Sequence, residues 1–281
     1  MSSYETAGDA RFIQFPHPGP EHVMRSKSRS WKLGDEAHRR TFLLSPGTYR
    51  NGISGAERRG ELAFWGEWEG GVDLITEVDP IESGPRWLCR PDPLAPSPRS
   101  EDGTPPQNTD PFVWGDRIRY TFCRQKGNGK LRRLGRGSLV LFGSSLQHRF
   151  VLDTVLVVAG WTEHENPRDL IGRTDEAHMR ATIHPMYGWG EDKRTYRLYF
   201  GASPDDTVDG MFSFVPARPA AGSASGFARP SIYFDGLINP DTRMQARVSD
   251  VGIDKLPQLW RAVADAVTAE GLVLATGLEL P

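Results

Sequence analysis

Two apolar stretches decide the fold: Ser-Leu-Val-Leu-Phe-Gly at positions 138–143 and Phe-Val-Leu-Asp-Thr-Val-Leu-Val-Val-Ala-Gly at positions 150–160. Both are strand-sized and rich in β-branched and aromatic residues, and neither approaches the roughly 18 apolar residues of a membrane-spanning helix. A short polar segment, Ser144 to Arg149, joins them. We therefore expect both strands at the centre of a sheet.

Further strands are expected on both sides of this pair, wherever short apolar segments alternate with turn residues. The predicted segments are Arg11–Phe15, Thr41–Leu44, Glu61–Trp68, Arg117–Cys123 and Thr195–Phe200. Pro16, Pro46 and Gly47 are expected to bound the first two of them. The 30 Gly and 22 Pro residues fit short strands and many turns better than a helical bundle.

One helix stands out near the end of the chain. It is expected to begin near Asp254, with Pro257 in its first turn, where a missing N–H is tolerated. Its apolar residues recur at helical spacing, at Leu256, Leu259, Trp260, Val263 and Val267. Gly271 is placed to end it, and residues 272–280 then read as a strand.

These elements predict an α+β fold that is mostly β, with a mixed or antiparallel barrel-like sheet, a C-terminal helix and long loops. We expect a single domain over residues 1–281. Its parts are an N-terminal β segment (1–90), a Pro-rich loop (91–111), a central β core (112–165) and a C-terminal α+β segment (195–281). A second loop, rich in Ala, Gly and Ser, is expected to be mobile from Ala217 to Arg229.

Composition and charge limit the classes of function. The chain has 281 residues, 25% of them charged, and a formal net charge of −2, which excludes a globally basic coat on DNA. Residues 1–10 are polar and carry no apolar core of a secretory signal, so we expect a cytoplasmic protein. The two cysteines, Cys89 and Cys123, form no metal-binding pattern, and the scattered histidines lack zinc spacing. We expect two free thiols, no metal and no cofactor.

The segment from Glu61 to Glu69 carries the first candidate site. In extended form Trp65, Glu67 and Glu69 share one face, while Leu62, Phe64 and Trp68 share the other. Indole rings beside carboxylates could bind a planar ring by stacking and by hydrogen bonds to its edge. The two acids could instead act as general acid and base in hydrolysis, or the segment could be a core strand with Trp68 inward and solvated acids.

Asp153 is the most informative single residue, because it interrupts an otherwise apolar strand. A buried carboxylate costs several kcal/mol unless it is paired. Asp153 should therefore meet an arginine, for which Arg124 and Arg149 are the candidates, or face a pocket. Both outcomes are compatible, since an Asp–Arg pair can line a site.

Other polar and aromatic residues extend the candidate site. Asn108 and Asp110 either form a turn before Pro111 or bind a ligand beside Trp114. Cys123 is either a nucleophile, with its thiolate stabilised by Arg124, or a buried structural thiol. Arg124 and Gln125 could present a fork and an amide to a base or phosphate, next to Tyr120. Ser144, in Gly-Ser-Ser at 143–145, sits either in an anion-binding turn or in a plain turn.

The segment from Arg117 to Trp161 resembles the core of PUA/EVE-type β-barrel modules, particularly those of bacterial nucleotide-modification-associated families. The resemblance rests on Tyr-Thr-Phe-Cys-Arg-Gln at 120–125, Leu-Arg-Arg at 131–133, Gly-Ser-Leu-Val-Leu-Phe-Gly-Ser at 137–144 and the return strand 150–158. The resemblance implies a small barrel whose open end recognises a nucleotide or base. The chain also resembles a bacterial family whose members run its full length, at Phe-Pro-His-Pro-Gly (15–19) and Phe-Trp-Gly-Glu-Trp-Glu (64–69). This second resemblance implies no activity.

The sequence therefore predicts a binding module for a nucleotide or for a modified base in nucleic acid, with no membrane partner. An enzyme that acts on a nucleotide or sugar-like substrate by carboxylate acid/base catalysis is the alternative, with Glu67, Glu69 or Asp153 as acid and base. Cys123 is a further catalytic candidate, as a nucleophile. A structural or partner-binding protein is the third possibility. The predicted ligand-binding residues are Trp65, Trp68, Asn108, Asp110, Trp114, Tyr120, Arg124, Gln125, Ser144 and Asp153. If either site hypothesis holds, one concavity should be lined by Trp65, Asn108, Tyr120, Arg124 and Asp153.

Overall fold

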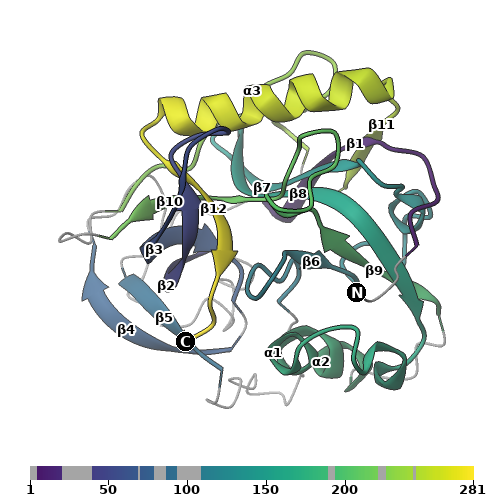
Figure 1. Cartoon of the computed structure of the whole chain (residues 1–281), viewed down its shortest axis with the longest axis horizontal. Coiled ribbons are helices and arrows are strands. Elements are labelled where there is room, and N and C mark those ends of the chain that lie inside the picture. Colours follow the sequence, from purple (N-terminus) through teal and green to yellow (C-terminus); the bar gives the residue numbers. More distant parts are fainter. Residues whose placement is uncertain are drawn as a thin grey trace.

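The computed structural model describes residues 5–20, 40–68, 70–78, 87–93, 109–188, 194–220, 226–242 and 245–281. Over these residues the chain forms two six-stranded sheets and one long helix (Figure 1). The expected α+β fold, mostly β with a barrel-like sheet and a C-terminal helix, is confirmed. Among the described residues, no helix is both long and apolar enough to cross a membrane.

The first sheet is mixed and has the order β11-β1-β7-β8-β9-β6. Its strands are β1 (Phe12–Pro20), β6 (Arg119–Tyr120), β7 (Leu139–Leu146), β8 (Arg149–His164), β9 (Tyr196–Gly201) and β11 (Arg247–Ser249). β7 and β8 lie at its centre, as their apolar sequences predict; they pair antiparallel to each other, and β1 lies parallel to β7. Strands buried on both faces carry continuous apolar runs, which is why these two were visible in the sequence.

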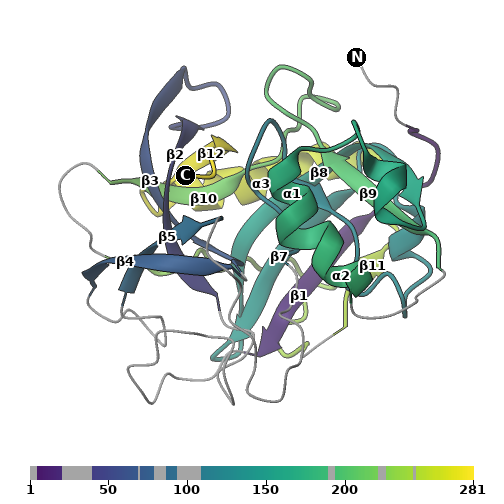
Figure 2. The ribbon, with the colours of Figure 1, turned by 90° about the horizontal axis from the view of Figure 1, so that it is seen from below.

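The second sheet contains a closed barrel of four antiparallel strands. Its order is β12-β10-β3-β2-β5-β4, and a further pairing of β12 with β2 closes the ring. Its strands are β2 (Thr41–Arg50), β3 (Glu57–Gly66), β4 (Gly71–Glu77), β5 (Trp87–Asp92), β10 (Val215–Pro219) and β12 (Val273–Leu278). Figure 2 shows the barrel strands on one side of the molecule and β1, β7, β8 and β9 on the other. The segment that resembles the PUA/EVE modules contributes β6, β7 and β8 to the mixed sheet, and the resemblance itself stays a prediction.

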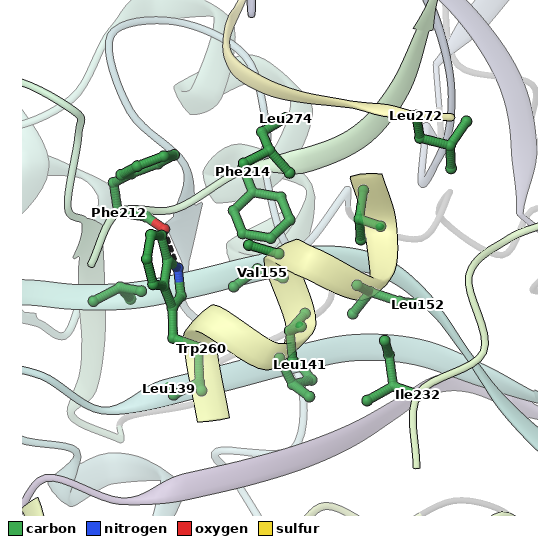
Figure 3. Close-up of a cluster of buried hydrophobic side chains, with 14 of the residues drawn as sticks. Leu139, Leu141, Leu152, Val155, Phe212, Phe214, Ile232, Trp260, Leu272 and Leu274 are labelled. Atoms are coloured by element: carbon green, nitrogen blue, oxygen red, sulfur yellow. Dashed lines mark hydrogen bonds between the residues drawn. The ribbon is translucent and has the colours of Figure 1, made fainter. Parts of the chain in front are cut away.

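Helix α3 (Leu256–Ala269) covers one side of both sheets (Figure 1). It buries Leu256, Trp260, Val263 and Val267 of the expected apolar stripe, while Leu259 is partly buried. The indole N–H of Trp260 donates to the Phe212 carbonyl oxygen at 2.8 Å (Figure 3). Gly271 follows the helix with φ of +73°, a conformation that glycine adopts without strain, so the chain turns here into β12. The short helical turns are η2 (Leu131–Arg133), η3 (Pro167–Leu170), α1 (Glu176–His178), η4 (Met179–Ile183), α2 (His184–Gly188) and η5 (Ile253–Lys255).

Two large apolar clusters fill the interior. The first joins α3 to both sheets, since it includes Phe42 and Trp65 from the barrel sheet and Leu152 and Val155 from the mixed sheet. Figure 3 shows Leu152 and Val155 beside α3. The second contains the opposite faces of β3 and β7, with Phe64 and Phe142 among its residues. The two sheets therefore share their core, and the residues on one face of β3 separate from those on the other as the alternation predicts.

Several strand boundaries differ from the sequence-based ones. Pro46 and Gly47 lie inside β2. Pro46 falls between the part of β2 that pairs with β5, at Phe42–Leu43, and the part that pairs with β12, from Gly47 onward, so its missing N–H leaves no ladder bond unmade, while its carbonyl oxygen accepts from the Glu279 N–H at 2.8 Å. β1 likewise continues past Pro16.

Two segments also differ from the secondary structure expected for them. Only Arg119–Tyr120 of the expected strand 117–123 pairs in the sheet, because the chain turns immediately afterwards. Ala217–Pro219 belongs to β10 and not to the expected mobile loop. Residues 94–108, most of the predicted Pro-rich loop, lie outside the described residues.

Candidate functional site

Asp153 lies at a β-bulge in the centre of the mixed sheet. Phe142 of β7 pairs with Thr154 of β8, but the next residue, Gly143, pairs with Leu152, so Asp153 is the extra residue on β8. A Cβ on Gly143 would clash with the Val151 carbonyl oxygen, which explains the glycine opposite the bulge. Bulges redirect single side chains and are common beside functional sites. Here the bulge turns a carboxylate into the shared core of the two sheets.

Arg40 and Glu67 meet Asp153 from the barrel sheet. Arg40 immediately precedes β2 and Glu67 immediately follows β3, and the pairing of Thr41 with Gly66 brings the two together at one end of this strand pair. Arg40 donates from Nε to Asp153 Oδ2 at 2.7 Å and from Nη1 to Glu67 Oε2 at 2.5 Å. One guanidinium therefore links carboxylates from both sheets.

A second arginine, Arg229, completes the group. Its Nη1 donates to Asp153 Oδ1 at 3.1 Å and lies 3.4 Å from Ser144 Oγ, while its Cζ lies over the Trp65 ring at 4.8 Å from the centroid. The indole N–H of Trp65 donates to the Phe227 carbonyl oxygen at 2.8 Å. We call Arg40, Trp65, Glu67, Ser144, Asp153 and Arg229 the Asp153 cluster.

The Asp153 cluster is buried and formally neutral. The four charged side chains are only 1–3% exposed, and two arginines balance two carboxylates. Burial by itself would lower the pKa of Arg40, but Asp153 and Glu67 outweigh that effect and raise it above its ordinary value. Buried ion pairs seldom stabilise a fold more than apolar residues of the same volume would, so a group of four charges in the core calls for a further explanation.

The expectation that Asp153 meets an arginine is correct, but the partners are Arg40 and Arg229, not Arg124 or Arg149. Arg149 and Arg124 are exposed. The reading of Glu67 as a solvated acid is also wrong, since Glu67 is buried against Arg40. Neither partner of Asp153 could be found by sequence distance, since Arg40 lies 113 positions before Asp153 and Arg229 lies 76 after it.

Trp65, Glu67, Asp153 and Ser144 are the predicted site residues that the structure brings together. Ser144 lies within β7, so Gly-Ser-Ser at 143–145 is strand and not the expected turn. The turn follows at Gln147 and His148, both with positive φ. Glu69 and Asn108, two further predicted residues, lie outside the described residues.

The other predicted aromatic residues belong to the second apolar cluster. Trp68 and Trp114 pack edge to face with ring centroids 5.1 Å apart, and Trp114 donates to Ser45 Oγ at 3.1 Å. Tyr120 stacks on Tyr199 and donates its hydroxyl proton to the Cys123 carbonyl oxygen at 2.6 Å. These residues do not join Trp65, and a role for them in ligand binding stays a prediction.

The predicted polar residues near Tyr120 bind the main chain. Asp110 accepts hydrogen bonds from the backbone N–H groups of Thr121 and Cys123 at 2.9 and 2.7 Å. Gln125 donates its amide to the Arg197 carbonyl oxygen and accepts from the Arg197 N–H, which ties it to β9. Cys89 and Cys123 are not joined by a disulfide, and Cys123 is half-buried.

A surface cavity of about 320 Å³ lies elsewhere, beside η3 and the short helices that follow it. It is lined by Pro167, Arg168, Ile171, Gly172, Thr174, Glu176, Met179 and His184. No predicted site residue is among these. Over the described part of the chain, no three His, Cys, Asp or Glu side chains gather as metal ligands would.

No family model, curated protein or solved structure matches this chain. The case for a function therefore rests on the chemistry of the Asp153 cluster.

Proposed function

We propose that this protein binds a nucleotide or a modified base at the Asp153 cluster. The observation that carries the proposal is the bulge at Asp153, which places a carboxylate within hydrogen-bond distance of two arginines beside an indole ring. The sequence-based hypothesis of nucleotide binding named Trp65 and Asp153 for the same roles.

The side chains of the Asp153 cluster match the chemistry of a nucleotide. An indole offers a stacking surface to any base, since every base has a π face. A carboxylate accepts hydrogen bonds from a base edge, and an arginine fork binds a phosphate or a base acceptor. Trp65, Asp153 and the two arginines supply all three functions within one group of contacts.

The position of the Asp153 cluster supports a site more than a scaffold. Arg40 and Glu67 lie just outside the ends of β2 and β3, where the chain leaves the barrel, and Arg229 comes from a segment without regular structure. Function is disproportionately carried by such segments on a rigid frame. The frame here is the bulged pair β7–β8.

The contacts of Glu67 and Asp153 with Arg40 argue against acid/base catalysis at this site. Hydrolysis by two carboxylates requires one of them to carry a proton as general acid. A guanidinium favours the ionised form of a neighbouring carboxylate, and Arg40 contacts both. We therefore propose binding and not hydrolysis for this site.

Calorimetric titration with nucleosides, nucleoside monophosphates and short single-stranded oligonucleotides, some with modified bases, tests the proposal. Trp65→Leu should weaken binding by at least about tenfold, because base–aromatic stacking contributes about 1–3 kcal/mol per base.

Trp161→Leu is the matched control for this titration. Trp161 is also buried, with its indole N–H bonded to the Ala7 carbonyl oxygen, but it lies on β8 away from Asp153 and under Arg197. Its loss should leave the affinity unchanged. Absence of any binding by the folded protein across the panel, or equal losses in both variants, would overturn the proposal.

A further inference from the structure

The guanidinium of Arg229 makes the two contacts that a bound base would make. Its carbon lies over the Trp65 ring at 4.8 Å from the centroid, and its Nη1 donates to Asp153 Oδ1 at 3.1 Å. A guanidinium is planar and delocalised, stacks on aromatic faces and carries its donors on its edge. A base with an exocyclic amino group has the same features, a π face and an edge N–H₂ donor.

The groups that Arg229 contacts are held in place independently of it. Trp65 is fixed by its hydrogen bond to the Phe227 carbonyl and by the Phe42 ring, whose centroid lies 5.4 Å away. Asp153 is fixed by the bulge and by Arg40, which binds the other carboxylate oxygen. The stacking face and the acceptor Oδ1 would therefore keep their positions if the Arg229 side chain moved.

The Arg229 backbone is anchored close by, so its side chain can move without unfolding the segment. Leu152 N–H donates to the Pro230 carbonyl at 2.8 Å, and Ile232 N–H donates to the Phe150 carbonyl at 3.0 Å. These bonds attach the segment that follows Arg229 to β8 through an isolated antiparallel β-bridge between Val151 and Ser231. Rotation about the side-chain bonds of Arg229 leaves both hydrogen bonds intact.

From this arrangement we infer that the site selects bases that carry an exocyclic amino group, and that Arg229 occupies the base position until such a base displaces it. This inference rests on the proposed function and names its ligand class. Cytosine, adenine and guanine can donate an amino N–H to Asp153 Oδ1. Uracil and thymine carry a single edge N–H that lies between two carbonyl oxygens. The Asp153 carboxylate would repel these oxygens.

Calorimetric titration with cytidine, adenosine, guanosine and uridine 5′-monophosphates tests the selection. Uridine monophosphate should bind at least about tenfold more weakly than the best of the other three, since a good base-edge contact contributes about 1–3 kcal/mol of discrimination. Asp153→Asn should reduce this difference, because its amide offers uracil a donor. The fold of each variant is checked by near-ultraviolet circular dichroism.

Arg229→Ala tests the displacement. The variant should bind the favoured monophosphate several-fold more tightly than the wild type, and guanidinium ion at millimolar concentration should compete with the nucleotide in the variant only. Arg218→Ala is the matched control, since Arg218 lies over the Phe227 ring at 5.1 Å and does not belong to the Asp153 cluster.

The outcomes separate the inference from the proposed function. Equal binding of all four monophosphates, or weaker binding by a folded Arg229→Ala variant, would overturn the inference and leave nucleotide binding standing. If none of the four monophosphates binds and oligonucleotides give no response, both the inference and the proposed function are overturned.

Discussion

Two buried aspartates in this molecule are satisfied in different ways. Asp110 accepts hydrogen bonds from two backbone N–H groups, those of Thr121 and Cys123, on a turn eleven and thirteen positions ahead. Asp153 instead receives side-chain N–H groups from Arg40 and Arg229, which come from distant segments of the chain.

The difference separates a structural carboxylate from a candidate binding group. Backbone donors cannot leave Asp110 without unfolding the turn, so no ligand can take their place at low cost. A side-chain donor such as Arg229 can be exchanged for a donor on a ligand by rotation alone. The identity of the donor atoms therefore says more about function than burial does, since both aspartates are buried.

Removal of the Asp153 carboxylate should have the largest effect on stability. Asp153→Ala leaves Arg40 and Arg229 in the core without their shared anion, and loss of one partner from a buried ion pair costs about 3–5 kcal/mol. Urea unfolding followed by circular dichroism measures this loss. The charge-balanced double variant Asp153→Leu/Arg229→Met should recover most of it, and a double variant as unstable as Asp153→Ala would contradict charge pairing as the cause.

Asp110→Asn tests the other side of the comparison. The amide keeps one acceptor oxygen and places an N–H₂ group against a backbone donor, so the loss should be about 1.5–3 kcal/mol, the range for a hydrogen bond to a charged group. Urea unfolding measures the loss, and nucleotide affinity should stay at the wild-type value. Loss of binding in a folded Asp110→Asn variant would contradict the assignment of Asp110 to a structural role.

Gly143→Ala should disturb the bulge that directs Asp153. The added Cβ meets the Val151 carbonyl oxygen and lies 2.8 Å from the Phe150 ring, and overpacking of this kind costs about 1–3 kcal/mol. Because the bulge also sets the direction of the carboxylate, affinity should fall together with stability. Gly60→Ala is the control, since a Cβ there meets only the Tyr49 ring at 3.8 Å, and it should change neither property.

Low pH should lower the free energy of unfolding because of His164, a buried histidine near Asp110. His164 bonds Thr121 Oγ1 and the Tyr187 hydroxyl, and burial lowers its pKa to about 4, against a smaller opposing effect of Asp169. The unfolded chain takes up a proton below the ordinary pKa of about 6.5, while the folded chain does not until about 4. Stability from His164 is therefore complete above about pH 6.5 and is lost as the pH falls toward 4.

The loss should be about 1.4 kcal/mol per pH unit within that window, because one proton is bound on unfolding. Urea unfolding at a series of pH values measures it, and His164→Gln should reduce the slope. Burial also lowers the pKa of His178, so part of the slope should remain in that variant. A slope that is the same with and without His164 would contradict this account.

Much of the fold could be predicted from the sequence, because period and burial leave a local signal. The central pair β7–β8 was visible as two apolar runs, and α3 was visible from its stripe and from Gly271. The closure of the barrel was not visible in detail, since β12 pairs with β2 more than two hundred positions away. Pro46 was misread as a boundary because its missing N–H falls between two ladder partners of β2.

The candidate site could be predicted only in part, for a similar reason. Asp153 was conspicuous because a charge in an apolar strand breaks a local rule, and Trp65 and Glu67 lay in a distinctive aromatic and acidic segment. Arg40 and Arg229 carry no local signal, since an arginine beside a strand end or in a loop is ordinary in a sequence. Only the three-dimensional arrangement shows that they neutralise the two acids.

The closing strand of the barrel has a consequence for synthesis of the chain. Because β12 covers residues 273–278 and pairs with both β2 and β10, the ring is incomplete while those residues remain inside the ribosome. The mixed sheet can assemble earlier, apart from β11, since β1 and β6 to β9 have all emerged once Gly201 has done so. A nascent chain stalled after Pro219 has emerged and before Val273 has done so should expose the open edges of β2 and β10.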